Sequence, residues 1–369
     1  MLARLVSPAA VLGVSLAVPT VYAEPRVSTD AKTGMQLYAE SCAACHGNDG
    51  RGMGAATVGF ETPLPDFTDC SFATREPDED WLAVVHDGGP ARAFDRIMPA
   101  YRDALSREEM QLVLDHLRTL CGDGAWPRGE LNLPRPLVTE KAFPEDETVL
   151  TMTTDLEGAG TVTPRIVYER RIGARHQVEV AAPFVFAERT EGDWIGGVGD
   201  LSIAAKSAIF HSHRTGSIIS VAAEIVVPTG DHDKGFGSGT TVFEPYVAVG
   251  QLLPAAFFLQ FQAGVELPAD RDRTDEGFWR IDVGRTFVQG LFGRSWSPMA
   301  EFLGTRELTS SESTQWSLAP QLQVSLSTRQ HILVSAGVVL PLTDAQSRDA
   351  QLVTYVLWDW FDGGLLSGW

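Results

Sequence analysis

The sequence is poor in positive charge and in long apolar runs, and each scarcity excludes a class of protein. Lysine and arginine total 29 against 48 aspartate and glutamate, so the net charge is −19. Because phosphate groups would repel such a chain, nucleic acid is excluded as a partner. After residue 23 no uncharged apolar run approaches the roughly 20 residues that a membrane-spanning helix needs. Membrane-spanning helices are therefore excluded from the exported chain.

The apolar stretch at the N-terminus has the features of an export signal. Arg4 precedes a run of apolar residues from Leu5 to Val18, and Pro19 ends it. The segment 21–23 then supplies the cleavage positions. We therefore predict that residues 1–23 are a signal peptide.

Cysteine is also scarce, and two of the four cysteines lie in one motif. Cys42-Ala43-Ala44-Cys45-His46 has the spacing C-x-x-C-H, at which c-type haem is attached. Two thioethers reach the two vinyl groups of one porphyrin, and the adjacent histidine binds the iron. A zinc ribbon would need a second C-x-x-C, and a thioredoxin-like redox pair would need a βαβ context. The motif predicts one covalently bound haem c.

The second axial ligand is less clearly marked. Pro99 keeps the segment around Met98 out of a helix, so that Met98 can point inward from a loop. His86 and His116 stay open as alternatives that would give bis-histidine ligation. Met53 lies too close to the motif in sequence, and Met110 belongs to the apolar stripe of a helix. A His/Met pair would favour electron transfer over oxygen chemistry.

The remaining cysteines, Cys70 and Cys121, have no metal-binding spacing. In an oxidising compartment we favour a disulfide between them, with two free thiols as the alternative.

A change in composition separates two regions. Residues 122–146 are rich in glycine, proline and charge, which predicts a stiff, extended linker between domains at 30–121 and 147–369. From residue 147 onward apolar residues recur at every second position, as in β-strands. We expect about twelve strands, at 147–156, 161–172, 174–186, 198–210, 215–228, 240–252, 255–267, 277–288, 295–307, 314–327, 329–341 and 350–360.

These strands favour a membrane barrel over a soluble β-sandwich. Most exceed the usual ~5–6 residues of soluble sheets, and short connections alternate with long ones. The positions between the apolar residues are often Ser, Gln, Gly or Ala, as in the lining of a lumen. Aromatic residues near strand ends suggest an interfacial girdle; they are Tyr168, Trp194, Phe243, Tyr246, Trp279, Trp296, Tyr355, Trp358 and Trp360.

Residues 33–121 resemble the all-α class I cytochrome c domains. The resemblance rests on Gly34, the Cys42 to Gly47 motif, the following glycines, Ile97-Met98-Pro99 and the helix that Ser106 opens. It implies thioether attachment by Cys42 and Cys45, and iron ligation by His46 and Met98. The proline often found after the glycine loop is missing, so the acceptor of the His46 ring proton is unassigned.

The C-terminal region resembles, more loosely, a family of outer-membrane barrels named for the meta-pathway of phenol degradation. The matching stretches are 199–206, 227–231 and 237–239. Joined to a cytochrome, this barrel is similar in architecture to the outer-membrane cytochrome–porin fusions of iron-oxidising bacteria. We therefore expect an antiparallel barrel in the outer membrane, in contact with lipid. The cytochrome would lie on the periplasmic side or in the lumen; a periplasmic protein is the alternative.

The expected function is electron transfer between periplasmic carriers and the outer membrane or cell exterior, where a donor or acceptor such as Fe(II) would act. The alternative is a porin-like transport or anchoring protein whose cytochrome is a carrier or redox sensor. An enzyme is the weaker hypothesis. The sequence contains no catalytic triad, and His211 and His213 are interpreted as residues of a solvated turn.

Overall fold

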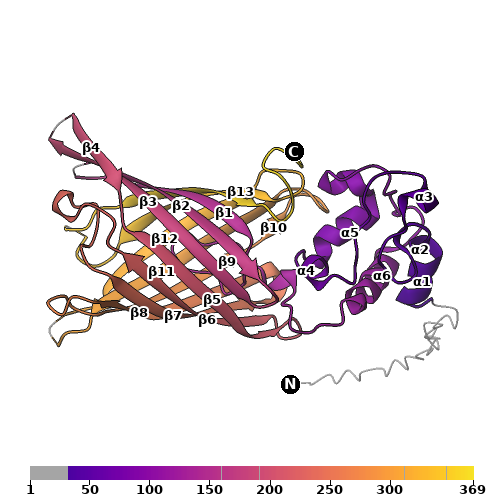
Figure 1. Cartoon of the computed structure of the whole chain (residues 1–369), viewed down its shortest axis with the longest axis horizontal. Coiled ribbons are helices and arrows are strands. Elements are labelled where there is room, and N and C mark those ends of the chain that lie inside the picture. Colours follow the sequence, from indigo (N-terminus) through magenta and orange to yellow (C-terminus); the bar gives the residue numbers. More distant parts are fainter. Residues whose placement is uncertain (1–31, 159, 191, 311, 346) are drawn as a thin grey trace, which may run out of the picture.

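The computed structural model describes residues 32–158, 160–190, 192–310, 312–345 and 347–369. The predicted signal peptide lies outside the described residues. A small helical domain stands at one end of a long barrel (Figure 1). Among the described residues, no helix is both long enough and apolar enough to cross a bilayer.

From residue 32 onward, where the description begins, the helical domain contains six α-helices and a 3₁₀ turn, η1 (Gly89–Arg92). The helices are α1 (Gly34–Ser41), α2 (Ala43–His46), α3 (Ala55–Val58), α4 (Cys70–Ala73), α5 (Asp78–Asp87) and α6 (Arg107–Leu120).

Local sequence explains where the two crossing helices α1 and α6 begin. Thr33 and Gln36 form a capping box at α1, and Ser106 and Glu109 form one at α6. A Cβ atom on Gly34 would lie 1.9 Å from the Leu112 carbonyl oxygen, so glycine allows α1 to approach α6. The buried stripe of α6 then forms the core of the domain; it comprises Met110, Val113, Leu114 and Leu117.

Within the part of the chain that the structure describes, fourteen antiparallel strands form a single sheet that closes on itself, because β1 pairs with β14. Twelve of them build the wall; β4 is a short strand that pairs only with β3, and β10 has two residues. The bounds are β1 (Glu147–Asp155), β2 (Thr161–Ile172), β3 (His176–Thr190), β4 (Asp193–Val198), β5 (Leu201–Ser212), β6 (Ser217–Val227), β7 (Val242–Leu252), β8 (Phe257–Pro268), β9 (Glu276–Arg285), β10 (Phe287–Val288), β11 (Ser295–Glu307), β12 (Gln315–Ser325), β13 (Ile332–Pro341) and β14 (Gln351–Asp359).

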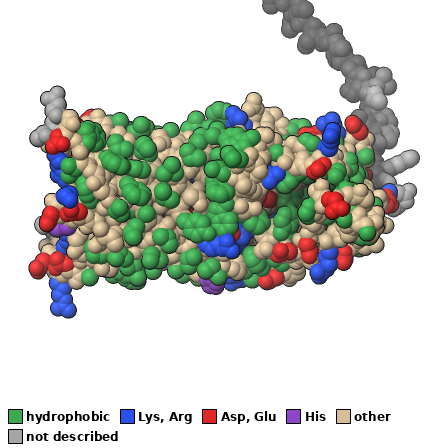
Figure 2. Space-filling model, turned by 45° about the horizontal axis from the view of Figure 1, so that its top comes forward, with side chains coloured by type: hydrophobic (Ala, Val, Ile, Leu, Met, Phe, Trp, Pro, Cys, Tyr) green, Lys and Arg blue, Asp and Glu red, His purple; other side chains and the backbone are tan. Residues whose placement is uncertain are grey.

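The inward face of the barrel carries many polar side chains, and the outward face is apolar. Gln260, Gln262 and Glu301 point inward and are buried, whereas alternate residues such as Leu150 and Ile166 point outward and are exposed. Figure 2 shows apolar side chains over the wall and charged side chains gathered toward its ends. This pattern is that of an outer-membrane barrel, whose wall contacts hydrocarbon.

The girdle prediction is wrong for two of its residues. Tyr246 and Tyr355 are buried inside the barrel, and the Tyr355 hydroxyl donates to the carbonyl oxygen of Arg135. Both tyrosines stand at inward positions of the alternation, which nearness to a strand end does not reveal.

The two rims of the barrel differ. β1 begins at the rim that faces the helical domain, and β14 ends there too, because Glu147 pairs with Asp359. We name it the proximal rim. Here β2 and β3 are joined by only three residues, 173–175. At the opposite, distal rim, residues 228–241 join β6 to β7. Short turns at one rim and long loops at the other are typical of outer-membrane barrels.

The predicted linker does not only connect the domains, because much of it lies inside the barrel. Residues 131–146, here called the luminal segment, bond to inward side chains from strands all around the wall. Gln260 of β8 donates to the Pro134 carbonyl, Lys206 of β5 to that of Lys141, and Ser220 of β6 to that of Ala142. The segment therefore fills part of the lumen before the chain enters β1.

Two charged side chains anchor the luminal segment. The Glu301 carboxylate accepts the backbone N–H groups of Leu137, Val138 and Thr139, at 2.6–3.2 Å. Arg135 donates to Glu147 and Glu169, at 2.6 Å each. Buried charges are tolerated when they are paired in this way.

The helical domain is docked on the proximal rim rather than in the lumen. Phe292, on the turn between β10 and β11, is buried in the core of the helical domain and lies 5.3 Å from the His86 ring. The Arg92 guanidinium donates to the Phe292 carbonyl oxygen at 2.6 Å. Arg329 of the barrel donates in turn to the carbonyl of Ala93 at 2.8 Å.

Candidate functional site

The motif predicted to carry haem lies on one short helix and the residue before it. Cys42 caps α2, and Cys45 and His46 occupy its last turn. Both cysteines are free thiols and are half-buried. In Figure 1, α1, α2 and α3 lie on the side of the helical domain that faces away from the barrel. The structure therefore brings the three residues together at the end of the molecule farthest from the barrel wall.

The protonation states of the motif suit its expected chemistry. Burial, together with the neighbouring Cys45 thiol, raises the pKa of Cys42 to about 11, so it remains a thiol at neutral pH. Burial lowers the pKa of His46 and thereby favours the neutral imidazole, the form that binds iron. The His46 Nδ1 is buried and has no hydrogen-bond partner among the described residues.

A glycine loop follows the motif and lies close to it. Gly47, Gly50 and Gly52 all have positive φ. A Cβ atom on Gly52 would lie 2.8 Å from the Leu64 side chain, so the loop depends on glycine there. The buried Tyr38 hydroxyl donates to the Gly47 carbonyl at 2.7 Å and joins α1 to the loop.

Hydrogen bonds hold the segment that carries Met98 in place beside the motif. The Gly89 N–H donates to the Met98 carbonyl at 3.0 Å, which fixes the loop against η1. The Tyr101 hydroxyl donates to the Ser41 carbonyl at 2.5 Å, directly before Cys42. Met98 and Cys42 both pack, half-buried, on the same apolar core.

The other ligand candidates have different surroundings. His86 bonds to the Asp87 carboxylate at 2.8 Å and faces Phe292 of the barrel. His116 packs edge-on against the Tyr38 ring, and Met110 is fully buried in the core. Met53 is partly exposed next to the glycine loop. Met98 therefore keeps its place as the predicted second ligand.

These residues fit a c-type haem. Two free thiols stand at the required spacing, and burial lowers the pKa of His46, which favours the imidazole form that binds iron. The His46 Nδ1 is buried without a hydrogen-bond partner among the described residues. Apolar side chains beside the motif, including Phe67 at 5.1 Å from the His46 ring, offer a surface for a porphyrin.

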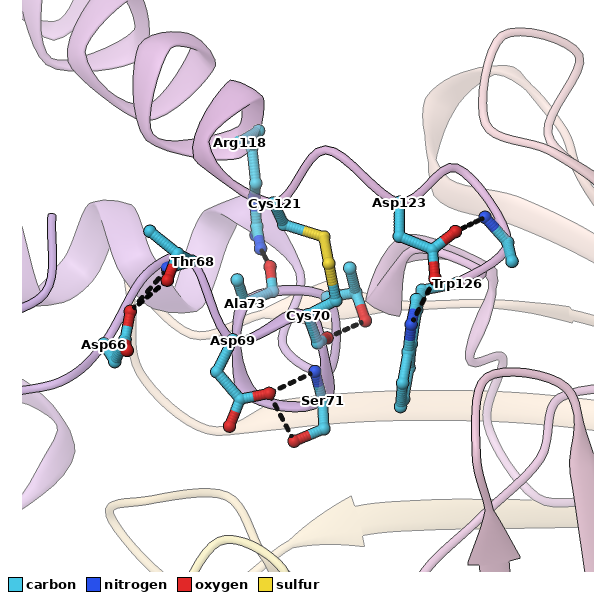
Figure 3. The surroundings of a disulfide bond; sticks show 12 residues. Asp66, Thr68, Asp69, Cys70, Ser71, Ala73, Arg118, Cys121, Asp123 and Trp126 are labelled. Carbon is cyan, nitrogen blue, oxygen red and sulfur yellow. Dashed lines mark hydrogen bonds between the residues drawn. A yellow bond between two sulfur atoms is a disulfide. The ribbon is translucent and has the colours of Figure 1, made fainter. Parts of the chain in front are cut away.

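Cys70 and Cys121 are joined by a disulfide that closes the base of the helical domain (Figure 3). Asp69 caps α4 by accepting from the Ser71 N–H at 2.9 Å. The bond links the start of α4 to the end of α6, directly before residues 122–146. It thereby fixes the point from which the chain runs to the barrel.

Three lumen carboxylates, those of Glu140, Glu169 and Glu179, have oxygen atoms within 4.8 Å of one another. Arg135 already supplies a positive charge to Glu169 at 2.6 Å, which accounts for the cluster without a metal ion. His211 is half-buried, not in a solvated turn, and its Nε2 lies 3.2 Å from the Ala125 carbonyl oxygen. His213 is exposed, as predicted.

Sequence reasoning missed Glu301, Arg135 and Phe292. For Glu301 a signal existed, because a carboxylate stands at an inward position of a regular alternation in 295–307. For Arg135 and Phe292 the sequence contains no comparable signal, since both lie in irregular segments.

Comparison with known proteins supports both regions. Residues 29–117 match the family model described as "Cytochrome C oxidase, cbb3-type, subunit III". Cytochrome c6 of Euglena gracilis is 32% identical over 93 residues, which cover 25% of this chain and 94% of that protein. The helical domain is thus a cytochrome c domain.

Residues 159–355 match the family model described as "Putative MetA-pathway of phenol degradation". An outer membrane channel from Pseudomonas putida F1 is similar in structure, with a TM-score of 0.44 and 10% identity, over 61% of this chain and 99% of that one. The NanC porin has a TM-score of 0.42 and 9% identity, over 57% and 98%.

Proposed function

Because this chain belongs to the family described as the "Putative MetA-pathway of phenol degradation" and carries a cytochrome c domain ahead of its barrel, we propose that it is a membrane-anchored electron carrier. Its barrel lies in the outer membrane, and its cytochrome domain exchanges electrons with soluble carriers of the periplasm. The observation that carries the proposal is the position of α2, which faces away from the barrel.

Cys42 and Cys45 would hold one haem c covalently, and His46 and Met98 would bind its iron. When bound, the haem iron carries one electron by changing between Fe(III) and Fe(II). The protein's own residues hold it: α2 and its N-cap residue Cys42 supply three of the four side chains, and the Tyr101 to Ser41 hydrogen bond holds the Met98 segment close to α2. The His/Met pair raises the reduction potential relative to bis-histidine ligation and leaves no open site on the iron.

The proximal rim faces the periplasm, since short turns face that side in outer-membrane barrels. The cytochrome domain then stands in the periplasm, with the haem motif turned toward soluble partners. An outward route across ~30 Å of hydrocarbon would need a further redox centre. The luminal segment fills part of that route with buried ion pairs. We therefore favour the anchored carrier over a conduit to an external donor or acceptor such as Fe(II).

The function can be tested with the full-length holoprotein reconstituted in the bilayer of liposomes. A soluble reduced cytochrome added on the side of the cytochrome domain should reduce the haem quickly, and a membrane-impermeant oxidant added on the other side should not reoxidise it. Fast reoxidation from the far side would establish the conduit instead. Failure of any soluble carrier to react would contradict both.

A Met98→Ala variant tests the second ligand within this function. We expect it to keep covalent haem, to lose the spectroscopic features of methionine ligation, and to have a lower reduction potential. A Met53→Ala variant, whose side chain is partly exposed, serves as the matched control and should change neither property. An unchanged spectrum in Met98→Ala would assign the ligand to another residue.

A further inference from the structure

The ten residues after β14, Trp360–Trp369, fold back over the outer surface of the barrel. We call them the C-terminal tail. On β14, Tyr355 and Leu357 point inward and are buried, so Trp358 points outward. Its indole N–H donates to the Gly363 carbonyl at 2.9 Å. Ile332, the cross-strand partner of Trp358, lies on the same outer face yet is only 2% exposed. The tail therefore lies against the outside of the wall at the proximal rim.

The tail has a defined shape because the turn between β12 and β13 holds it at several points. The Arg329 N–H donates to the Gly368 carbonyl at 3.1 Å, and its guanidinium donates to the Asp362 carbonyl at 2.8 Å. Gly368 has a φ of +77°, and a Cβ atom there would lie 2.8 Å from that of Arg329. The path of the tail is thus specified by this chain.

The outer side of the tail is apolar and uncovered. Leu365, Leu366 and Trp369 are 47%, 89% and 61% exposed. Side chains of this size are rarely left so exposed together on a water-facing surface, because burying them would be favourable. Their position on the outer wall means that the medium beside them is the one that surrounds the barrel.

The tail is continuous with the lipid-facing surface. Trp360 stacks on Tyr168 with 5.9 Å between ring centroids, and Tyr168 is exposed on the outer face of β2. The Arg170 guanidinium lies 5.1 Å above the Trp360 ring. Tryptophan, tyrosine and arginine at this level are typical of the boundary between hydrocarbon and headgroups.

We propose that the C-terminal tail is an interfacial membrane anchor, whose Leu365, Leu366 and Trp369 side chains enter the phospholipid leaflet at the proximal rim. The same tail also contacts the cytochrome domain, since the Arg75 guanidinium lies 4.1 Å from the Phe361 ring centroid. Arg329 bonds to both the tail and the Ala93 carbonyl of the cytochrome domain. The tail thereby sets the position of the cytochrome domain relative to the membrane plane.

Fluorescence quenching by brominated lipid tests the anchor. The full-length holoprotein and its Trp369→Phe variant are reconstituted in phosphatidylcholine vesicles with or without bromine on the acyl chains. Subtracting the emission of the Trp369→Phe variant from that of the wild type gives the emission of Trp369. Haem quenches this emission equally in both lipids, so the ratio of the values in brominated and ordinary lipid reports quenching by bromine alone. We expect brominated lipid to reduce this emission at least twofold. An unquenched Trp369 that aqueous iodide quenches would overturn the proposal.

A double variant, Leu365→Asn with Leu366→Asn, should reduce the quenching of Trp369 by more than half, while the heat-modifiable gel mobility of the barrel stays unchanged. Leu112→Asn is the control, because Leu112 is about as exposed as Leu365 but lies on α6 of the cytochrome domain. It should leave the quenching unaltered. If instead Trp369 is unquenched and the double variant converts a detergent-solubilised dimer to a monomer, the tail contacts a second copy and the proposal is wrong.

Discussion

In the cytochrome domain Leu114 and Val113 are completely buried and carboxylates such as Glu108 lie at the surface, whereas in the barrel Leu150 and Ile166 face outward and Glu301 is buried. The two regions of one chain therefore place the same residue types on opposite sides. The difference shows that the surrounding medium, water in one case and hydrocarbon in the other, decides which face of an amphipathic element is turned inward. Changes that act on only one region test how independent the two are.

The largest effect is expected from Cys42→Ala combined with Cys45→Ala. Without the thiols no thioether can form, so covalent haem staining and the cytochrome absorption bands should be lost completely. The barrel should still form, with unchanged heat-modifiable mobility, because its closure depends on β1 and β14. Loss of the barrel as well would contradict the separation of the two regions.

Removing the disulfide by Cys70→Ser with Cys121→Ser should destabilise only the cytochrome domain. The bond links residues 51 apart, and a loop of that length predicts a loss of ~4 kcal/mol in the free energy of unfolding. Thermal unfolding followed at the haem bands should shift to lower temperature, whereas unfolding of the barrel should not. Equal shifts in both transitions would show that the domains unfold together.

A pair of matched leucine substitutions sharpens the comparison of buried faces. Leu114→Ala leaves a cavity in the cytochrome core and should lower the free energy of unfolding by ~3 kcal/mol, measured by denaturant titration at the haem bands. Leu322→Ala, on the outer face of β12, leaves no protein cavity and should cost under ~1 kcal/mol. A comparable loss at Leu322 would mean that this face packs against protein rather than lipid.

Glu301→Gln should loosen the luminal segment without unfolding the barrel. In the variant an NH2 group, which donates, stands where one oxygen of Glu301 accepts backbone N–H groups. The free energy that holds the luminal segment in place should therefore fall by ~2 kcal/mol. We expect a higher ionic conductance in planar bilayers than for the wild type. Glu307→Gln, an exposed glutamate on the same strand, is the control, and an equal conductance in both variants would deny Glu301 its anchoring role.

The smallest effect is expected from pH at the contact between the domains. Burial raises the pKa of Asp362 to about 7, and burial with the nearby Asp362 carboxyl raises that of Glu76 well above its usual value. When the domains separate, both return to a pKa of ~4. The docked state thus holds more protons, and docking is strongest below pH ~4 and weakens as the pH rises through 7.

Hydrogen exchange in the segment around Glu76 should accordingly increase as the pH is raised from 5 to ~8 after correction for intrinsic exchange rates. Glu76→Gln mimics the protonated carboxyl and should flatten this dependence. If Glu76→Gln keeps the full dependence, other groups control the contact.

Much of the fold follows from local patterns. The predicted strands 161–172 and 295–307 coincide with β2 and β11, because their alternation depends only on which face meets lipid. The predicted strand 198–210 differs from β5 (Leu201–Ser212), and the separate β4 was not predicted. There the chain turns at Gly199, which bonds to the Pro183 carbonyl of a neighbouring strand.

The sequence by itself determined the attachment motif, the capped helices around it and the alternation of the wall, since each depends on residues a few positions apart. Only the tertiary structure decided that residues 131–146 lie in the lumen, that Phe292 enters the cytochrome core, and that the tail folds back against the turn between β12 and β13. The reason is physical. In the lumen the Arg135 guanidinium is paired with Glu169 of β2, and the Glu145 backbone N–H donates to Gln177 of β3. Closure brings these partners to one level, and before closure nothing distinguishes such a segment from a solvated linker.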